Sequence, residues 1–217
     1  MPRKIITAAF VSLDGVMQAP GGPEEDPAGG FALGGWTFHY WDDVMGAAMG
    51  EIFSKPYALL LGRKTYDIFA AHWPYQNDPF ADAFNAAPKY VATHRPESLT
   101  WQNSLPLGGD VVASLRKLKD EDGPDLITQG SSDLIQTLLP AGVIDEIRLL
   151  IFPLVLGKGK RLFGAGTVPA AYRLASSQAS STGVIMATYE PAGAGRTGSF
   201  AHETPSAAEI ERRRNWT

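Results

Sequence analysis

The sequence predicts an α/β fold in which helices cover both faces of a mostly parallel sheet and an antiparallel hairpin ends the chain. Strand-like apolar segments alternate with segments whose apolar residues recur at helical spacing. Polar turns follow several of the strand-like segments, as is typical of the junction between a strand and a helix. The last two strand-like segments are joined by a tight turn at Thr182-Gly183, which predicts a hairpin.

The composition is that of an ordinary globular domain. With 217 residues, 44% of them hydrophobic, the chain can bury a sizeable core. The net charge of −4 argues against a nucleic-acid partner, because such binding needs clustered Lys and Arg. There are no cysteines and the four histidines have no metal-ligand spacing, so we expect no metal site. No long apolar run indicates a membrane partner or a secretory segment, and we expect a cytoplasmic protein.

The first half of the chain begins with a predicted strand over residues 5–13, which ends at the turn signal Asp14-Gly15. Residues 18–35 are rich in Gly and Pro and predict a long surface loop, either a binding loop or a plain insertion. Helical spacing over residues 41–53 predicts a helix. A strand at residues 58–61 and a helix starting at Thr65 follow.

The second half continues the alternation of strands and helices. Helices are predicted at residues 110–119 and 134–139, and strands at residues 89–93, 125–129, 146–156, 172–181 and 183–190. We expect residues 1–190 to form the folded domain and residues 191–217 to form a tail outside it. A short helix over residues 206–215, with Ser206 as its N-cap, fits the end of that tail, which is either disordered or docked on a neighbouring subunit.

Three polar clusters directly follow predicted strands, where ligands bind in sheets of this kind. They are Gly62-Arg63-Lys64-Thr65, Thr93-His94-Arg95 and Gly130-Ser131-Ser132-Asp133. Glycine and serine let a backbone approach a ligand closely, free N–H groups at a helix start attract phosphate, and arginine binds phosphate bidentately. The first cluster alone fits a helix cap with solvated cations equally well, the second alone fits a solvated surface arginine, and in the third Ser132 or Asp133 can be an ordinary N-cap as well as part of a binding turn. The conjunction of the three predicts a phosphate-bearing ligand.

The order of motifs resembles the dihydrofolate-reductase superfamily. It is most similar to the family of the C-terminal reductase domain of the bifunctional riboflavin-biosynthesis deaminase/reductase. The resemblance covers about residues 3–190 and is carried by SLDGV (12–16), LLLGRKTYDIF (59–69), KYVATHRP (89–96), DLITQGSSDLIQTLL (125–139) and VIDEIRLLIFPLVLGKGKRLF (143–163).

The resemblance implies a three-layer α/β/α fold and NADPH as the cofactor. It implies that Arg63, Lys64 and Thr65, after Gly62, lie along the pyrophosphate and the adenosine 2′-phosphate. It further implies that His94 and Arg95, after Thr93, flank the adenosine ribose phosphate, and that Gly130, Ser131, Ser132, Asp133 and Leu134 wrap the pyrophosphate. Dihydrofolate reductases join two glycines by a cis bond before that last helix. The second glycine is Ser131 here, so we expect no cis bond.

The catalytic carboxylate is harder to place. Dihydrofolate reductases carry one on the first helix, but the matching position falls near residues 44–46, which are Val-Met-Gly. Asp42 and Asp43, one turn earlier, and Asp14, at the end of the first strand, are the candidates. Acids at a helix start usually complement the helix dipole, and Asp14 fits an ordinary turn equally well.

The resemblance implies an NADPH-dependent reductase of a small heteroaromatic or ribosylaminopyrimidine-like substrate, similar to 5-amino-6-(5-phosphoribosylamino)uracil reductase. A non-catalytic nucleotide-binding module of the same fold, or a dihydrofolate- or flavin-linked reductase, remains open. Related proteins suggest a homodimer with its interface at residues 149–159; the same residues also fit a buried strand of the sheet, and both can hold. Trp36, Trp41, Trp73 and Tyr66 offer flat surfaces for a ring or fill the core.

Overall fold

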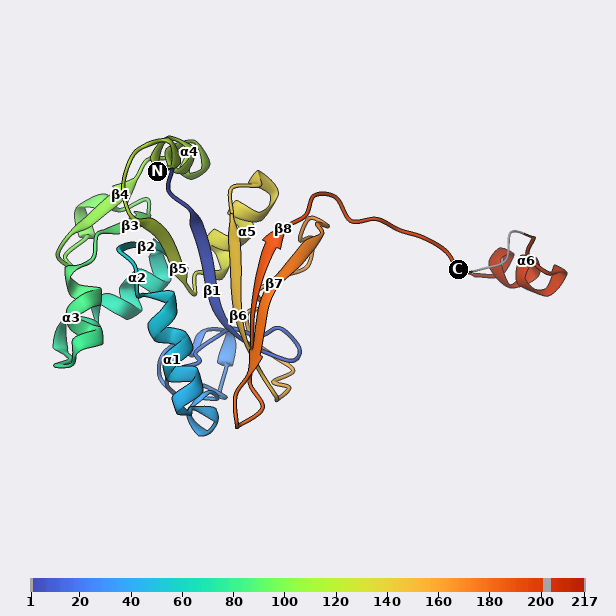
Figure 1. Ribbon diagram of the computed structural model, residues 1–217, viewed down its shortest axis with the longest axis horizontal. Helices are drawn as coiled ribbons and strands as arrows, with labels where there is room; N and C mark the ends of the chain where they lie inside the picture. Colours follow the sequence, from blue (N-terminus) through green and yellow to red (C-terminus); the bar gives the residue numbers. More distant parts are fainter. Residues whose placement is uncertain (1, 201–203, 217) are drawn as a thin grey trace.

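The computed structural model describes residues 2–200 and 204–216, so Met1 of the predicted domain and residues 201–203 and 217 of the predicted tail lie outside it. One eight-stranded sheet forms the centre, in the order β4-β3-β2-β5-β1-β6-β8-β7 (Figure 1). The strands are β1 (Ile5–Ser12), β2 (Tyr57–Gly62), β3 (Lys89–Ala92), β4 (Ser104–Leu107), β5 (Asp125–Gln129), β6 (Glu146–Phe152), β7 (Tyr172–Ala179) and β8 (Ile185–Pro191).

The direction of the strands confirms the predicted fold class. The strands from β4 to β6 pair in parallel, with β1 in the middle between β5 and β6. β8 pairs antiparallel with both β6 and β7 and so forms the expected terminal hairpin. Since parallel strands need crossovers, the chain places a helix or a long loop between most of them.

Helices cover both faces of the sheet. On one face α4 (Val111–Asp120) and α5 (Ser132–Ala141) pack on alternate strand residues such as Leu60 and Leu126. On the other face lie α1 (Asp43–Ile52), α2 (Arg63–Ala70) and α3 (Pro79–Ala86), which contact the intervening residues such as Leu59 and Leu61. The strict alternation follows from the two-residue period of a strand, and burial on both faces explains the continuous apolar runs.

Two elements escape the sequence prediction. The first is α3, which is short. Two start signals precede it in the sequence: Asp78 is its N-cap and accepts from the N–H groups of Phe80 and Ala81, and Pro79 follows. The second is β4, whose Pro106 is a residue that usually argues against a strand when only the sequence is known. It is tolerated here because β4 is the edge strand beside β3.

Several boundaries also differ from the prediction. α2 begins at Arg63 rather than Thr65, and β6 ends at Phe152 because Pro153 follows it. α5 begins at Ser132 rather than at residue 134, and the residue that precedes it is Ser131, in the left-handed conformation with φ of 68°. As expected at Ser131, there is no cis peptide bond, here or elsewhere in residues 2–200 and 204–216.

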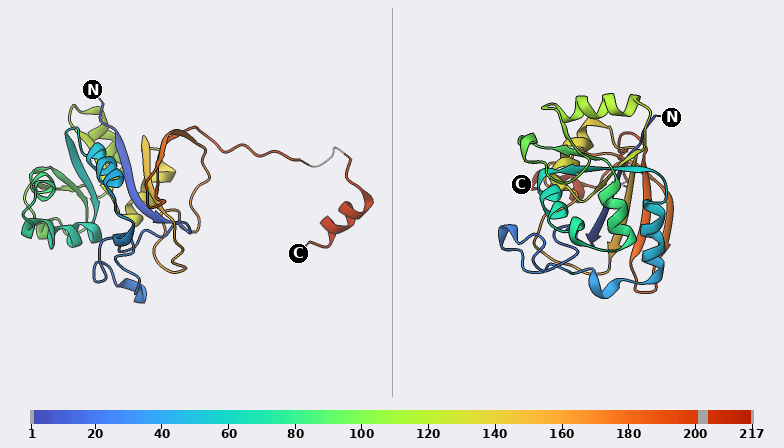
Figure 2. Two further views of the ribbon diagram at one scale, coloured as in Figure 1. Left: turned by 60° about the horizontal axis from the view of Figure 1, so that its bottom comes forward. Right: turned by 90° about the vertical axis from the view of Figure 1, so that its left-hand side faces the viewer.

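The C-terminal helix α6 (Ala207–Arg214) lies at the end of an extended segment, away from the sheet (Figures 1 and 2). Ser206 caps it, since its Oγ accepts a hydrogen bond from the N–H of Glu209. Among the described residues, no helix is long and apolar enough to cross a membrane.

Candidate functional site

A cleft of about 1650 Å³ lies at the carboxyl ends of the parallel strands. Four strands contribute a residue at or near their carboxyl end to its lining: Phe10 from β1, Gly62 from β2, Ala92 from β3 and Gln129 from β5. Pockets for one small ligand usually measure ~300–1,000 Å³, so this cleft has room for two ligands side by side. Its position is the one that an open parallel sheet offers for ligands.

We distinguish two ends of this cleft. The helix end is lined by the starts of α2 and α5 and by Arg95. The loop end is lined by residues 17–26, by Trp41 and residues of α1, by residues 71–73 and by Lys160. Ten of the twelve predicted cofactor residues line the helix end, namely Gly62, Arg63, Lys64, Thr65, Arg95, Gly130, Ser131, Ser132, Asp133 and Leu134.

The two turns of the helix end are joined to each other. The N–H of Gly62 donates to Oγ of Ser131 at 2.9 Å, which links the end of β2 to the start of α5. Gly130 has a φ of +85°, and a Cβ there would lie 3.6 Å from the Thr65 side chain. The sequence thus folds two distant strand-to-helix turns into one surface, and a glycine supplies the conformation that the second turn needs.

Both helices of the helix end present open N-termini. Within the described chain, no side chain caps α2 or α5. The first N–H groups of a helix have no partner inside the helix, and they carry the positive end of its dipole. Two such ends in one cleft form a surface suited to the phosphates of a dinucleotide.

Arg63 lines the helix end as predicted, but its guanidinium is engaged by other residues of the protein. Its Nε and Nη2 contact the Asp67 carboxylate, and its Nη1 donates to Ser98 Oγ at 2.5 Å and to the carbonyl oxygen of Arg95 at 3.3 Å. The Asp67 carboxylate raises the pKa of Arg63 further. The guanidinium therefore braces the start of α2 against the segment after β3, with few donors left for a phosphate.

Lys64 and Arg95 are the cations of the helix end that remain available. Both side chains are exposed, and neither has a hydrogen-bond or ion-pair partner within residues 2–200 and 204–216. Thr93 and His94 lie outside the lining. Oγ1 of Thr93 accepts from the N–H of Arg95 at 3.0 Å, which holds the turn that presents Arg95.

Asp14, predicted as a catalytic candidate, lies outside the cleft lining. Its carboxylate accepts from Ser12 Oγ at 2.6 Å and from the N–H groups of Leu156 and Gly157 at 3.0 and 2.9 Å. Arg161 lies 3.4 Å away. These hydrogen bonds, above all that from Ser12, lower the pKa of Asp14 to about 2. These contacts hold the end of β1 against the loop after β6. The catalytic role of Asp14 stays a prediction that the geometry does not support.

Asp42 and Asp43 also lie outside the lining. Asp42 is the N-cap of α1, because its Oδ1 accepts from the N–H of Met45, while its Oδ2 accepts from the N–H and Oγ of Ser181. These hydrogen bonds, led by that from the Ser181 hydroxyl, lower the pKa of Asp42. Asp43 is an exposed residue of the first turn of α1. Their catalytic assignment likewise stays a prediction without geometric support.

The loop end holds polar groups that the sequence reasoning did not single out. The charged residues in its lining are Glu24, Glu25, Asp26 and Lys160, and His72 lies with them. From α1 come Gly46, Met49 and Gly50, so this helix offers space rather than a carboxylate. The only sequence signal for the acids was the long Gly- and Pro-rich loop that carries them.

The predicted aromatic surfaces divide between core and cleft. Trp41 and Trp73 line the loop end. Trp36 is buried, and its Nε1 donates to the carbonyl oxygen of Gln18 at 2.8 Å. Tyr66 is buried as well, and its hydroxyl accepts from the N–H of Trp101 at 2.8 Å.

One buried atom beside the helix end could be satisfied by a polar ligand. Oε1 of Gln129 is inaccessible to water and has no hydrogen-bond partner in the described part of the chain, although Gln129 lines the cleft. An unpaired buried carbonyl costs about 1–3 kcal/mol. A ligand that donates an N–H at this point, as the carboxamide of a nicotinamide can, would remove that cost.

The sheet order and the cleft at its carboxyl edge define a dihydrofolate-reductase-like α/β protein. The chain belongs to the RibD C-terminal domain family, whose family model matches residues 3–186. A curated relative is the uncharacterized protein YyaP of Bacillus subtilis, which is 26% identical over 86% of this chain and 94% of its own length.

Two solved structures share the fold. One is dihydrofolate reductase from Enterococcus faecalis, complexed with NADP(H) and RAB-propyl, with a TM-score of 0.54 and 15% identity over 87% of this chain and 96% of that chain. The other is the diaminohydroxyphosphoribosylaminopyrimidine deaminase/5-amino-6-(5-phosphoribosylamino)uracil reductase from Thermotoga maritima, with a TM-score of 0.57 and 15% identity. The match covers 88% of this chain and 57% of that two-activity protein.

Proposed function

We propose that this protein is an NADPH-dependent reductase of a small nitrogen-containing substrate, of the type that serves riboflavin biosynthesis. The observation that carries the proposal is the meeting of two uncapped helix N-termini, those of α2 and α5, in one cleft with room for a second ligand. The reductase activity of the Thermotoga maritima protein and the NADP(H) complex of the Enterococcus faecalis enzyme support it.

In this proposal the helix end binds the cofactor. The first N–H groups of α2 and α5 bind the pyrophosphate, and Lys64 and Arg95 supply positive charge for the 2′-phosphate. When bound, NADPH supplies the hydride, and the protein contributes orientation and charge placement. Loop 18–35 closes the other end and keeps bulk water from the reacting atoms.

A titration tests the cofactor assignment. We expect NADPH to bind the full-length protein in the micromolar range, and Lys64→Ala and Arg95→Ala to weaken NADPH by about tenfold or more, since charge-assisted hydrogen bonds are lost. Affinity for NADH, which lacks the 2′-phosphate, should change by less than about threefold. Lys55→Ala is the control, because Lys55 is exposed and lies outside the cleft lining.

The outcome separates the candidate functions. Absence of NADPH binding would contradict the proposal, and equal losses for NADH and NADPH would remove the 2′-phosphate assignment. Binding without NADPH oxidation across a panel of pterins, pyrimidines and quinones would favour a non-catalytic nucleotide-binding module. A yellow purified protein would favour a flavin-linked enzyme.

We also propose a homodimer whose interface is formed by β7 and β8 rather than by the strand part of residues 149–159. The strand β6 lies inside the sheet between β1 and β8 and is largely buried, so it is not free to pair with a partner. The edge strand β7 is exposed along nearly its whole length, with Leu174 50% accessible and Ile185 on the neighbouring β8 47% accessible. Light scattering tests this: Leu174→Glu should convert a dimer to a monomer, and a monomeric wild type would refute it.

A further inference from the structure

The loop end of the cleft carries the opposite charge from the helix end. Its acids are Glu24, Glu25 and Asp26, and its single permanent cation is Lys160. Nζ of Lys160 lies 2.5 Å from Oδ2 of Asp26, so the two charges neutralise each other. Among the described residues, Glu24 and Glu25 form no ion pair with a lysine or an arginine.

This charge pattern bears on the choice of substrate. A phosphate placed at the loop end would meet carboxylates rather than free cations, and like charges brought together in a partly dry cleft repel strongly. A neutral or cationic group meets no such penalty. The free cations, Lys64 and Arg95, lie at the helix end, where the cofactor phosphates are proposed to bind.

Glu25 is the acid with a free, fixed oxygen. Its Oε2 accepts from the N–H groups of Gly21 and Gly22 at 2.6 and 3.2 Å, which holds the carboxylate in one orientation. Its Oε1 has no hydrogen-bond partner within the described residues, and a half-buried oxygen of this kind is an acceptor for a ligand. Burial raises the pKa of Glu25, and the hydrogen bonds from the N–H groups of Gly21 and Gly22 offset part of that rise.

The loop that carries Glu25 is held in place by its own contacts. Nε2 of the buried Gln18 donates to the carbonyl oxygens of Asp26 and Ala28, and its Oε1 accepts from the N–H of Lys160 at 2.9 Å. The acid therefore stands on a braced loop rather than on a mobile one.

The loop end that contains Glu25 is also lined by aromatic residues. Trp41, just before α1, and Trp73, in the segment after α2, line the loop end, and α1 contributes only Met49 and the two glycines Gly46 and Gly50. Aromatic rings favour flat partners in stacked or edge-on arrangements. Flat walls with one oriented acceptor select a planar ring that offers an N–H group.

We propose that the loop end binds a planar nitrogen heterocycle that is uncharged or cationic and carries no phosphate, with Glu25 Oε1 accepting a hydrogen bond from one of its N–H groups. This proposal rests on the reductase function proposed above and names the substrate class. It separates this chain from the Thermotoga maritima protein, whose reductase substrate carries a phosphate.

A matched pair of ligands tests the proposal on the full-length protein. The pair is 5-amino-6-(5-phosphoribosylamino)uracil and the same compound after enzymatic removal of its phosphate. Calorimetric titration with and without saturating NADP⁺ should show the phosphate-free compound binding about tenfold tighter or more. Equal or tighter binding of the phosphorylated compound would overturn the proposal.

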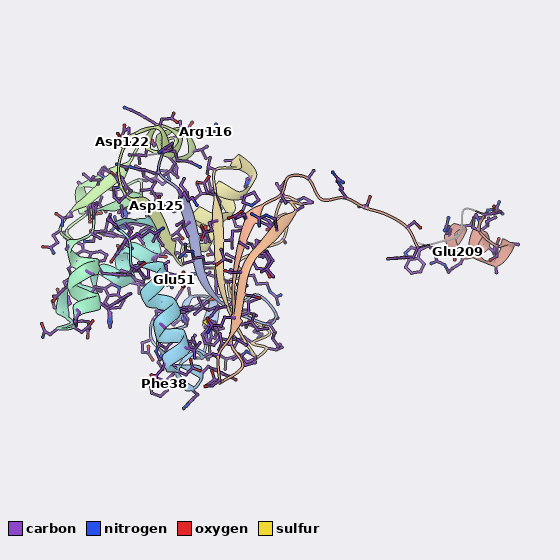
Figure 3. The ribbon with its side chains drawn as sticks, viewed as in Figure 1. Phe38, Glu51, Arg116, Asp122, Asp125 and Glu209 are labelled. Carbon is purple, nitrogen blue, oxygen red and sulfur yellow. The ribbon has the colours of Figure 1, made fainter. Side chains whose placement is uncertain are left out.

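Two variants locate the effect. Glu25→Gln keeps an oxygen for Gly21 and Gly22 but loses the charge, and it should weaken the phosphate-free compound by about tenfold while leaving NADPH affinity unchanged. Glu51→Gln, an exposed position on α1 outside the lining, is its control and should change neither (Figure 3). An unchanged affinity in Glu25→Gln would remove Glu25 from the proposal.

Asp26→Asn should increase the affinity for the phosphorylated compound. It frees Lys160 from its ion pair, while an amide oxygen can still accept from the N–H of Ala28. The phosphorylated compound should then bind about fivefold tighter or more, and no gain would contradict the charge argument. Because NADPH binding is measured separately, failure of the cofactor proposal and failure of this one give different results.

Discussion

Replacing Asp14 by Asn distinguishes a structural acid from a catalytic one. The two carboxylate oxygens accept from Ser12 Oγ and from the N–H groups of Leu156 and Gly157, which lie more than 140 residues away. An amide keeps one acceptor oxygen and turns an N–H₂ group toward a donor. The variant also removes the charge that faces Arg161.

The lowered pKa sets the size of the effect. The carboxyl group falls from its ordinary value of 3.8 to about 2 in the folded protein. Each pKa unit is worth about 1.36 kcal/mol, so about 2.4 kcal/mol is the upper limit. Since the side chain is 17% accessible to solvent, which screens the charge, we expect Asp14→Asn to cost about 1–2 kcal/mol and to lower Tm by about 2–8 °C.

The pH dependence follows from the direction of the shift. A depressed folded-state pKa stabilises the protein above the unfolded value of 3.8, and this stabilisation is lost as the pH falls through about 2. The free energy of unfolding, measured by urea titration, should therefore differ between wild type and variant at about pH 6 and converge toward about pH 2.

The same variant can refute the reasoning. An unchanged Tm together with a loss of turnover of about a hundredfold or more would mean that Asp14 acts on the substrate. Glu51→Gln serves as the control for loss of an exposed charge and should shift stability by less than about 0.5 kcal/mol.

Three further predictions concern other parts of the chain. Gly130→Ala should lose about 1–2 kcal/mol in thermal unfolding and weaken NADPH binding, because φ is +85° there; unaltered values would show that the turn tolerates a side chain. Lys89 is fully buried, with its Nζ 4.1 Å from the Trp101 ring centroid, and burial lowers its pKa to about 8. Between about pH 8 and 10.5 the unfolded chain binds more protons than the folded one, so the free energy of unfolding of the wild type should rise with pH. Relative to Lys89→Met the rise should be about 3 kcal/mol at most. A difference between the two proteins that stays constant over this range in urea titrations would contradict this. Truncation after residue 195, which keeps the backbone hydrogen bonds of Ala192 and Gly193 to Ala171, should leave Tm and NADPH affinity unchanged, since α6 lies apart from the sheet; a fall of several degrees would reveal a docked tail.

The sequence alone determined most of the element order and the edge of the sheet at which ligands bind. Periodicity and turn residues are local, so the runs 58–61 and 125–129 and the polar turns after them could be read directly. Because parallel strands all end at one edge, those turns had to meet, and the turns at Gly62 and Gly130 do. Short elements such as α3 and β4 were missed because packing and edge position, rather than local pattern, stabilise them.

The tertiary structure alone decided which charges are free. Arg63 and Lys64 are neighbours with the same local signal, yet Arg63 is engaged by Asp67 and by Ser98, which is 35 residues away, while Lys64 faces the cleft. Both carboxylate oxygens of Asp14 likewise accept hydrogen bonds from the N–H groups of residues 156 and 157, whereas one carboxylate oxygen of Glu25 has no partner within the described residues. The partner of a polar group depends on segments that only folding brings together, and a residue pattern along the chain does not encode that choice.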